Sequence, residues 1–261
     1  MKMFYGMIGG TGTDHKLGNG YVENICCSAA SMWTGKKFKR WTPPNHKLMF
    51  IDSGGFSFFY KSGDYPFSTE QYVELAETYK PDYLAVRDYP CEPDTARVAG
   101  LKTNKERIDA TIRNTLECLK FKHLPWVAVV QGYKLSEYQY SCDQMKEYNI
   151  ETPLIAIGSL CVRKKVADAR RIIRVVQKNF PLARLHGFGI DFRFLHDPYI
   201  VTTLWSSDTQ AWQFNNFGHG PAEYHLPTCE REKLLNFRDY QVQVDELLDR
   251  FEKNSKVTQE W

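Results

Sequence analysis

The sequence predicts an α/β protein: a single TIM-like (β/α)8 barrel domain with an amphipathic helix near its C-terminal end. Short apolar runs of strand length recur along the 261 residues. They are nearly continuous rather than alternating, which is typical of parallel strands covered on both faces. Amphipathic stretches of helical period lie between them. This repeated β-α order favours a closed barrel, with a doubly wound open sheet as the alternative.

The predicted strands follow directly from the apolar runs. Each run is short enough for a strand and rich in β-branched, aromatic or leucine side chains. In chain order the predicted strands are 4–8, 21–28, 48–52, 83–88, 126–131, 154–158, 184–189 and 204–207.

The helical stretches between the strands supply the crossovers. Helices are predicted over 69–79, 104–120, 136–148 and 164–179 because apolar residues recur there at helical spacing. Ser68 precedes the first of them and is a candidate N-cap.

The last predicted element is a long, charged amphipathic helix over residues 230–254. Its apolar side chains are available to pack on the barrel or on a second copy of the chain in a homodimer: Leu234, Phe237, Val244, Leu247, Leu248 and Phe251. We expect one domain over residues 1–261, with its catalytic motifs between about 48 and 210.

Composition limits the class of protein. Hydrophobic residues make up 43% of the chain, enough for one large core. No run reaches the ~18 apolar residues of a membrane span, and residues 1–6 lack the apolar region of a signal peptide. We therefore expect a cytoplasmic protein without membrane contact.

The cysteines are seven, an odd number, and are scattered along the chain. Reduced thiols of an intracellular enzyme fit this pattern better than a disulfide framework. No Cys-x-x-Cys pair is present, and Cys229 with His219 and His225 is a poor zinc set, so no metal is predicted. Cys26 and Cys27 are interpreted as inert buried thiols.

Basic residues are clustered although the formal net charge is only +3. The cluster predicted to contact a nucleic-acid backbone comprises Lys36, Lys37, Lys39 and Arg40. Loop residues beside it offer aromatic surfaces for bases and a further cation: Trp33, Trp41, Tyr60, Lys61 and Tyr65. Two more basic runs lie at 163–165 and 170–174. Solvated helix faces and core aromatics are the alternative interpretation.

An apolar strand that ends in Asp52-Ser53-Gly54-Gly55 indicates an active-site corner. The carboxylate lies at the C-terminal end of a strand, and the two glycines follow where the backbone must pass close to another group. A plain turn, with Asp52 as its cap, is the alternative for this tetrapeptide.

Polar residues and glycines also end other predicted strands. Because the C-terminal ends of barrel strands meet at one mouth, these residues are expected to share a pocket: Asp52, Asp88, Gln131, Gly132, Gly158, His186, Gly187, Ser207 and Asp208. Asp88 can accept from N–H groups of a purine-like base and Gln131 can donate to its carbonyl. The amides of Gly132, Gly158 or Ser159 can approach a flat ligand. Asp52 and Asp208 are suited to acid/base and nucleophilic roles at an anomeric carbon.

Two other features are not given catalytic roles. The Gly-rich segment 9–13 matches neither the dinucleotide-binding nor the P-loop pattern, and is interpreted as a loop. His186 ends an apolar strand, which favours a packing or stacking group over a general base.

The ordered motifs resemble the tRNA-guanine transglycosylase superfamily. They are Asp52-Ser53-Gly54-Gly55-Phe56, Asp88, Val130-Gln131-Gly132, Ile157-Gly158-Ser159-Leu160, His186-Gly187-Phe188-Gly189 and Asp208. Members are β/α barrels that exchange guanine for a 7-deazaguanine through a covalent enzyme–nucleic-acid intermediate. The resemblance implies that Asp208 attacks C1′ of the target nucleotide and that Asp52 is the general acid/base. It implies no redox cofactor and no ATP.

The same resemblance assigns the recognition of the base. It implies that Asp88, Gln131 and Gly132 read the base and that Gly158 and Ser159 add backbone contacts. His186 takes the place of a residue that stacks on the base. Ser53, Gly54 and Gly187 belong to the same motifs and complete the predicted base-binding set.

The sequence also departs from the superfamily pattern. Ser159 stands where a second glycine is usual, Tyr133 replaces another glycine, and Asp191 competes with Asp208 for the nucleophile's role, although its position suits an N-cap. The zinc element of three cysteines and one histidine found in tRNA-acting members is missing. The chain is most similar to the compact DpdA-type enzymes of phages and bacterial genomic islands, which insert 7-deazaguanines into DNA.

We therefore expect base exchange in DNA that installs a 7-deazaguanine such as 7-cyano-7-deazaguanine. The same chemistry on tRNA is one alternative. A non-catalytic nucleic-acid-binding subunit that keeps the barrel is the other. The sequence leaves open whether helper proteins open the duplex.

Overall fold

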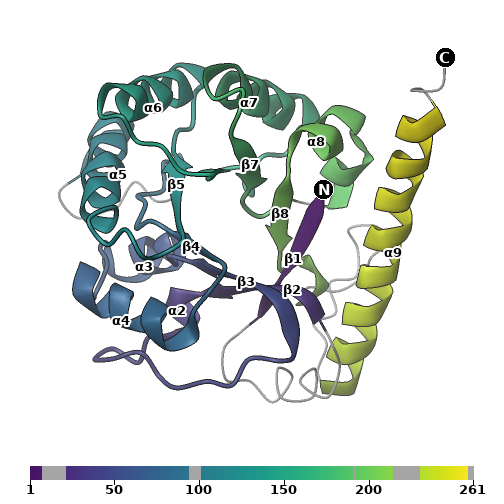
Figure 1. Cartoon of the computed structure of the whole chain (residues 1–261), viewed down its shortest axis with the longest axis horizontal. Coiled ribbons are helices and arrows are strands. Elements are labelled where there is room, and N and C mark those ends of the chain that lie inside the picture. Colours follow the sequence, from purple (N-terminus) through teal and green to yellow (C-terminus); the bar gives the residue numbers. More distant parts are fainter. Residues whose placement is uncertain (8–21, 94–100, 191, 214–229, 258–261) are drawn as a thin grey trace.

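The structure is a computed structural model that describes residues 1–7, 22–93, 101–190, 192–213 and 230–257. Its strands are parallel and pair in chain order, and β8 pairs back to β1 to close the barrel (Figure 1). The predicted TIM-like barrel is confirmed, and the open sheet is excluded.

The described part of the chain contains these strands: β1 (Lys2–Met7), β2 (Val22–Ser28), β3 (His46–Asp52), β4 (Tyr83–Ala85), β5 (Trp126–Val130), β6 (Leu154–Ile157), β7 (Arg184–Gly187) and β8 (Ser206–Thr209). Its helices and 3-10 turns are α2 (Ala29–Met32), α3 (Gly55–Ser62), α4 (Thr69–Tyr79), α5 (Asn104–Cys118), α6 (Leu135–Glu147), α7 (Val166–Asn179), η2 (Phe192–His196), α8 (Pro198–Thr203), η3 (Ala211–Gln213) and α9 (Glu230–Val257).

Capping explains why the longer helices begin where they do. The Ser68 hydroxyl accepts from the Gln71 amide, and the Gln71 side chain bonds back, so that α4 starts with a capping box. Thr103 and Glu106 make the same reciprocal pair at the start of α5. The prediction over 69–79 coincides with α4, and the other predicted crossover helices are found with shifts of one or two residues at their ends.

Every predicted strand is found with one or both ends shifted by one to three residues, and the shifts of β4 and β8 have an identifiable cause. β4 ends at Ala85. The Val86 amide still donates to the Val127 carbonyl of β5 at 3.0 Å, but beyond it the backbone bonds to side chains of α5: Asn114 donates to the Arg87 carbonyl at 2.9 Å, and the Tyr89 amide donates to Thr111 at 2.9 Å. β8 begins at Ser206 because Leu204 caps the end of α8. Asp208 therefore lies within β8 rather than after it.

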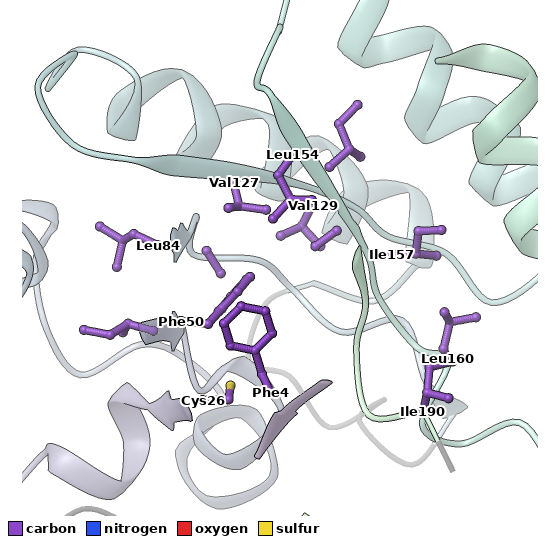
Figure 2. Close-up of a cluster of buried hydrophobic side chains, with 14 of the residues drawn as sticks. Phe4, Cys26, Phe50, Leu84, Val127, Val129, Leu154, Ile157, Leu160 and Ile190 are labelled. Carbon is purple, nitrogen blue, oxygen red and sulfur yellow. The ribbon is translucent and has the colours of Figure 1, made fainter. Parts of the chain in front are cut away.

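The barrel interior is filled by rings and branched side chains (Figure 2). Phe4, Phe50 and His186 come from β1, β3 and β7, which are not neighbours in the sheet, so their contacts cross the interior. The rings of Phe50 and His186 stack at 4.5 Å between centroids, and Phe4 meets Phe50 edge-on at 5.8 Å. This packed layer forms the floor beneath the C-terminal mouth.

Helix α9 lies along one side of the barrel (Figure 1). Phe237, Tyr240 and Val244 are buried, and the Phe237 ring contacts Tyr5 and Trp212 at 5.3 and 5.1 Å. The apolar face therefore packs on the barrel. The side chain of Leu234 lies outside the described residues.

No helix in the ranges described above has the length and apolar character needed to cross a bilayer.

Candidate active site

A pocket of about 560 Å³ opens at the C-terminal ends of the strands. Small-molecule sites commonly occupy about 300–1,000 Å³. Six of the predicted site residues line it: Asp52, Asp88, Gln131, Gly158, Ser159 and Asp208. These residues follow or end β3, β4, β5, β6 and β8, so the barrel brings together side chains that are far apart in sequence.

The backbone after β3 fixes the position of Asp52. Gly54 has a φ of 77°, and a Cβ there would lie 2.6 Å from the amide nitrogen of Ala30. Only glycine combines that left-handed conformation with that close approach. The Gly54 amide then donates to Asp52 Oδ2 at 3.1 Å, which turns the carboxyl group toward the pocket. The turn interpretation therefore describes the backbone of this tetrapeptide, and Asp52 also lines the pocket.

The carboxyl of Asp52 is suited to proton transfer at neutral pH. Burial raises its pKa to about 7, with smaller contributions from the negative charges of Asp88 and Asp208. Hydrogen bonds from the Gly54 amide and the Ser28 hydroxyl oppose the shift. A group with a pKa near the working pH can both give and take a proton.

Asp88 is held by a buried hydrogen-bond network. Ser53 donates to Asp88 Oδ1 at 2.7 Å, and the amide nitrogen of Gln131 donates to Oδ2. The Tyr65 hydroxyl donates to the Asp88 backbone carbonyl at 2.7 Å and lies 2.8 Å from the Ser53 hydroxyl. Burial raises the pKa of Asp88, while the bonds from Ser53 and Gln131 oppose that rise. The carboxyl group is thus fixed in place with both oxygens engaged.

The side chain of Gln131 lies flat against Gly158. A Cβ on Gly158 would approach the amide atoms of Gln131 to within 2.3–2.5 Å, so glycine is required for this packing. Ser159, in the left-handed conformation with a φ of 58°, donates to Gln131 Oε1 at 3.1 Å. The amide of Gln131 is therefore oriented, with its nitrogen toward Asp88 and its oxygen toward Ser159.

Asp208 is oriented from the β7 side of the mouth. The Gly189 amide donates to Asp208 Oδ1 at 2.8 Å, and His186 Nε2 lies 3.3 Å from the same oxygen, within ion-pair range but without hydrogen-bond geometry. Nδ1 of His186 lies 2.7 Å from the Ser206 hydroxyl, which fixes the ring. Both contacts to Asp208 fall on one carboxylate oxygen.

Five predicted base-binding residues do not line the pocket. His186 is fully buried and stacks on Phe50 beneath Asp208, so the predicted stacking on a base is replaced by a supporting contact to the carboxylate. Gly187 packs against Leu204 and Ile190, and Gly132 packs against α6. Ser53 and Gly54 donate hydrogen bonds to Asp88 and Asp52, which line the pocket themselves.

Other residues of the pocket were not predicted. Glu92, Cys161 and Phe188 line it, and so does Phe56, whose ring is 49% exposed. Glu92 is buried, and burial raises its pKa. The sequence offered one signal for Glu92, which is its position in the loop that follows Asp88.

The basic cluster lies beside a second pocket of about 590 Å³, between the loop over 33–40 and α4. Lys37, Lys39 and Arg40 line it, and Lys36 is exposed nearby. Among the aromatic residues predicted as base surfaces, Tyr60 is exposed, whereas Trp41 is buried and Tyr65 belongs to the Asp88 network. The side chain of Lys61 lies outside the described residues.

Arg163, from a second basic run, supports the pocket wall. Its guanidinium donates to the carbonyls of Ser159 and Tyr133 at 3.0 and 2.8 Å and lies over the Tyr133 ring. The neighbouring Lys164 and Lys165 are exposed.

Within the described ranges, no group of three or more His, Cys, Asp or Glu residues is arranged to hold a metal ion. His219, His225 and Cys229 lie outside those ranges, as do Asp191 and the Gly-rich segment 9–13.

A protein-family model described as DpdA, DeoxyPurine in DNA protein A, matches residues 36–254, most of the chain. No curated protein matches the chain. The matched span contains every side chain named above as lining the 560 Å³ pocket.

Proposed function

The chain belongs to the DpdA family, DeoxyPurine in DNA protein A, and we propose that it is a transglycosylase that exchanges guanine in DNA for a 7-deazaguanine. The observation that carries the proposal is one pocket at the barrel mouth in which Asp52 and Asp208 accompany the Asp88–Gln131 pair. Two carboxylates suit substitution at an anomeric carbon, and the pair suits a guanine-type edge.

In the first step, a carboxylate oxygen of Asp208 attacks C1′ of the target nucleotide. The bond from C1′ to N9 breaks, and guanine leaves with a proton from Asp52. Gly189 and His186 hold Oδ1 of Asp208, so we assign the attack to Oδ2. The Gly189 hydrogen bond to a carboxylate oxygen is charge-assisted and keeps the nucleophile oriented.

In the second step, the incoming 7-deazaguanine attacks the same carbon. Asp52 takes the proton from its ring N9, and the bond to Asp208 breaks. Two inversions at C1′ give net retention. A pKa near 7 lets Asp52 act as acid in one step and base in the next.

Base recognition falls to the Asp88 side of the pocket. The Asp88 carboxylate accepts from the N–H groups of the base, and Gln131 with the Gly158 backbone faces its carbonyl. Phe56 and Phe188 supply ring faces for stacking. The target nucleotide must leave the duplex stack to enter, and Lys36, Lys37, Lys39 and Arg40 are assigned to the flanking phosphates.

The test is the entry of labelled base into nucleic acid. The full chain is incubated with double-stranded DNA, single-stranded DNA or tRNA, each with radiolabelled guanine or 7-cyano-7-deazaguanine. We expect label in DNA that is abolished by Asp52→Ala and Asp208→Ala. Asp143→Ala, an exposed acid on α6, is the matched control and should keep activity.

A denaturation-resistant protein–DNA adduct should form with the wild type and be lost in Asp208→Ala. Label in tRNA alone would assign the chain to tRNA exchange. Absence of label in all three nucleic acids would favour a binding subunit over an enzyme.

A further inference from the structure

The loop after β4 brings an acidic side chain into the pocket in addition to Asp52, Asp88 and Asp208. Glu92 is only 3% exposed and lines the pocket beside Ser159. The exchange chemistry described above gives it no role. A buried carboxyl group in a binding pocket is costly unless it interacts with a partner or ligand, so its contribution needs an explanation.

Glu92 ends a chain of polar contacts along one wall. Asp88 accepts from the Gln131 amide, and Gln131 accepts from the Ser159 hydroxyl at 3.1 Å. The same Ser159 hydroxyl lies within hydrogen-bond reach of Glu92, so its one proton can be donated to either side chain. The order along the wall is therefore Asp88, Gln131, Ser159, Glu92.

The edge of a guanine-type base presents its groups in a matching order. The exocyclic amine and ring N1–H are donors, the O6 carbonyl is an acceptor, and position 7 comes next. Asp88 suits the donors and Gln131 with Gly158 suits O6. The next position along the wall, at Ser159 and Glu92, then faces the substituent on C7 of a 7-deazaguanine.

We propose that Glu92, together with Ser159, recognises the substituent on C7 of the incoming base and selects a nitrile over an unsubstituted ring. The assignment rests on the proposed function. Glu92 is then a specificity-determining residue for the second step of exchange, in which the new base binds.

The chemistry of the wall favours an acceptor substituent. Burial raises the pKa of Glu92, and the Ser159 hydrogen bond and the Arg163 charge only partly oppose that rise. A neutral carboxylic acid carries an O–H that can donate to a nitrile nitrogen. An ionised Glu92 would instead favour a cationic aminomethyl group, and the two cases can be separated by experiment.

The experiment is calorimetric binding of free bases to the full chain. 7-Deazaguanine and 7-cyano-7-deazaguanine differ only at C7, so the ratio of their dissociation constants isolates that position. We expect the wild type to bind the cyano base about five- to tenfold more tightly, the size of one hydrogen bond. Glu92→Ala should abolish the ratio and leave the affinity for 7-deazaguanine nearly unchanged.

Two variants complete the series. Glu92→Gln keeps an N–H donor and should retain most of the preference, whereas Glu92→Met fills the volume without a donor and should lose it. If Glu92→Ala does not fold, Glu92→Met takes its place in the comparison. Glu147→Ala, an exposed acid at the end of α6, is the control and should leave the ratio unchanged.

Three results would overturn the assignment. The first is that Glu92→Ala and Glu92→Met both keep the ratio, and the second is that Glu92→Ala weakens the binding of both bases equally. The third, from an added titration with the 7-aminomethyl base, is that the wild type binds that base more tightly than the cyano base. Exchange of labelled base into DNA without any preference at C7 would remove the role of Glu92 and leave the proposed function standing. If the wild type neither binds nor exchanges any of these bases, both proposals fail.

Discussion

The side-chain nitrogen of Gln131 donates a hydrogen bond to Oδ2 of Asp88, so the two residues assigned to the base are bonded to each other. A bound base must replace that contact with contacts to itself. Ser53 still holds the other oxygen of Asp88 at 2.7 Å, and Ser159 holds the oxygen of Gln131 at 3.1 Å. The recognition edge is therefore preorganised before the base arrives.

Gly158→Ala should disrupt this edge. The new Cβ would lie 2.3–2.5 Å from the amide atoms of Gln131, which must then move away from Asp88. We expect base affinity to fall by about tenfold or more, since at least one hydrogen bond to the ligand is lost. Gly187→Ala is the matched control, because its new Cβ would crowd Leu204 and Ile190 rather than the Asp88–Gln131 pair, and it should lower the melting temperature without changing base affinity. Equal affinities for Gly158→Ala and the wild type would contradict the assignment.

Asp52→Asn should change how stability depends on pH. The pKa of Asp52 is raised from 3.8 to about 7, so the folded chain holds this proton more tightly than the unfolded chain. The resulting stabilisation is complete below pH 3.8 and is lost as the pH rises toward 7. Because asparagine does not titrate, the variant should gain stability relative to the wild type between pH 5 and pH 8. Urea unfolding at both pH values measures this, and a constant difference would exclude the raised pKa.

His186→Phe should slow formation of the covalent adduct. Phenylalanine keeps the ring stacked on Phe50 but removes the Nε2 atom that lies 3.3 Å from Asp208. A lost electrostatic contact of about 1 kcal/mol corresponds to about a fivefold slower step. The KM for the base should stay the same. His186→Phe leaves the Ser206 hydroxyl without its imidazole partner, and adding Ser206→Ala removes that hydroxyl. The double variant should therefore be more stable than His186→Phe, while adduct formation stays slow. A rate that recovers with stability would assign His186 to packing alone.

Charge reversal at Lys37 and Arg40 should weaken binding to DNA. Each phosphate contact contributes about −0.9 to the slope of log affinity against log salt concentration, so loss of two contacts should flatten the slope by about 1.8. The matched control reverses Arg171 and Lys178, which are exposed on α7, on the side of the barrel away from α4 (Figure 1). Identical slopes for the two double variants would remove the basic loop from the interface.

Phe237→Ala should destabilise the monomer. The ring is 2% exposed and packs against Tyr5 and Trp212, so truncation should cost about 3–5 kcal/mol of unfolding free energy. Val242→Ala, at a side chain 55% exposed on the same helix, should cost little. A change in oligomeric state at unchanged stability would instead show that the face packs on a second copy.

Much of the barrel could be predicted because strands buried on both faces are continuous apolar runs. The limits of that signal appear at the strand ends. Residues 83–88 read as strand, but side chains of α5 bond to the Arg87 carbonyl and the Tyr89 amide, and no local pattern encodes such partners. Leu204 read as strand and instead caps α8, because an apolar residue fits either position.

The site could be predicted in part for a similar reason. Polar residues at strand ends identified Asp52, Asp88, Gln131 and Asp208, since the barrel sends those ends to one mouth. The sequence did not show which side of its strand His186 faces, and the structure places it on the floor. Tyr65 was interpreted as an aromatic surface for bases or as a core aromatic, and neither interpretation included the hydrogen bond from its hydroxyl to the Asp88 carbonyl. Long-range contacts of this kind have no signature within a short window.

The pairing of β1 with β8 sets Phe4 directly opposite Asp208. Within this sequence β1 is synthesised before all the other strands of the barrel, and its pairing with β8 can form only after β8 is made. Until then its edge is unpaired, and open edges of apolar strands associate with other chains. Prematurely terminated products should accordingly be found in aggregates rather than as slow enzymes, and an all-or-none gain of activity should accompany ring closure during synthesis.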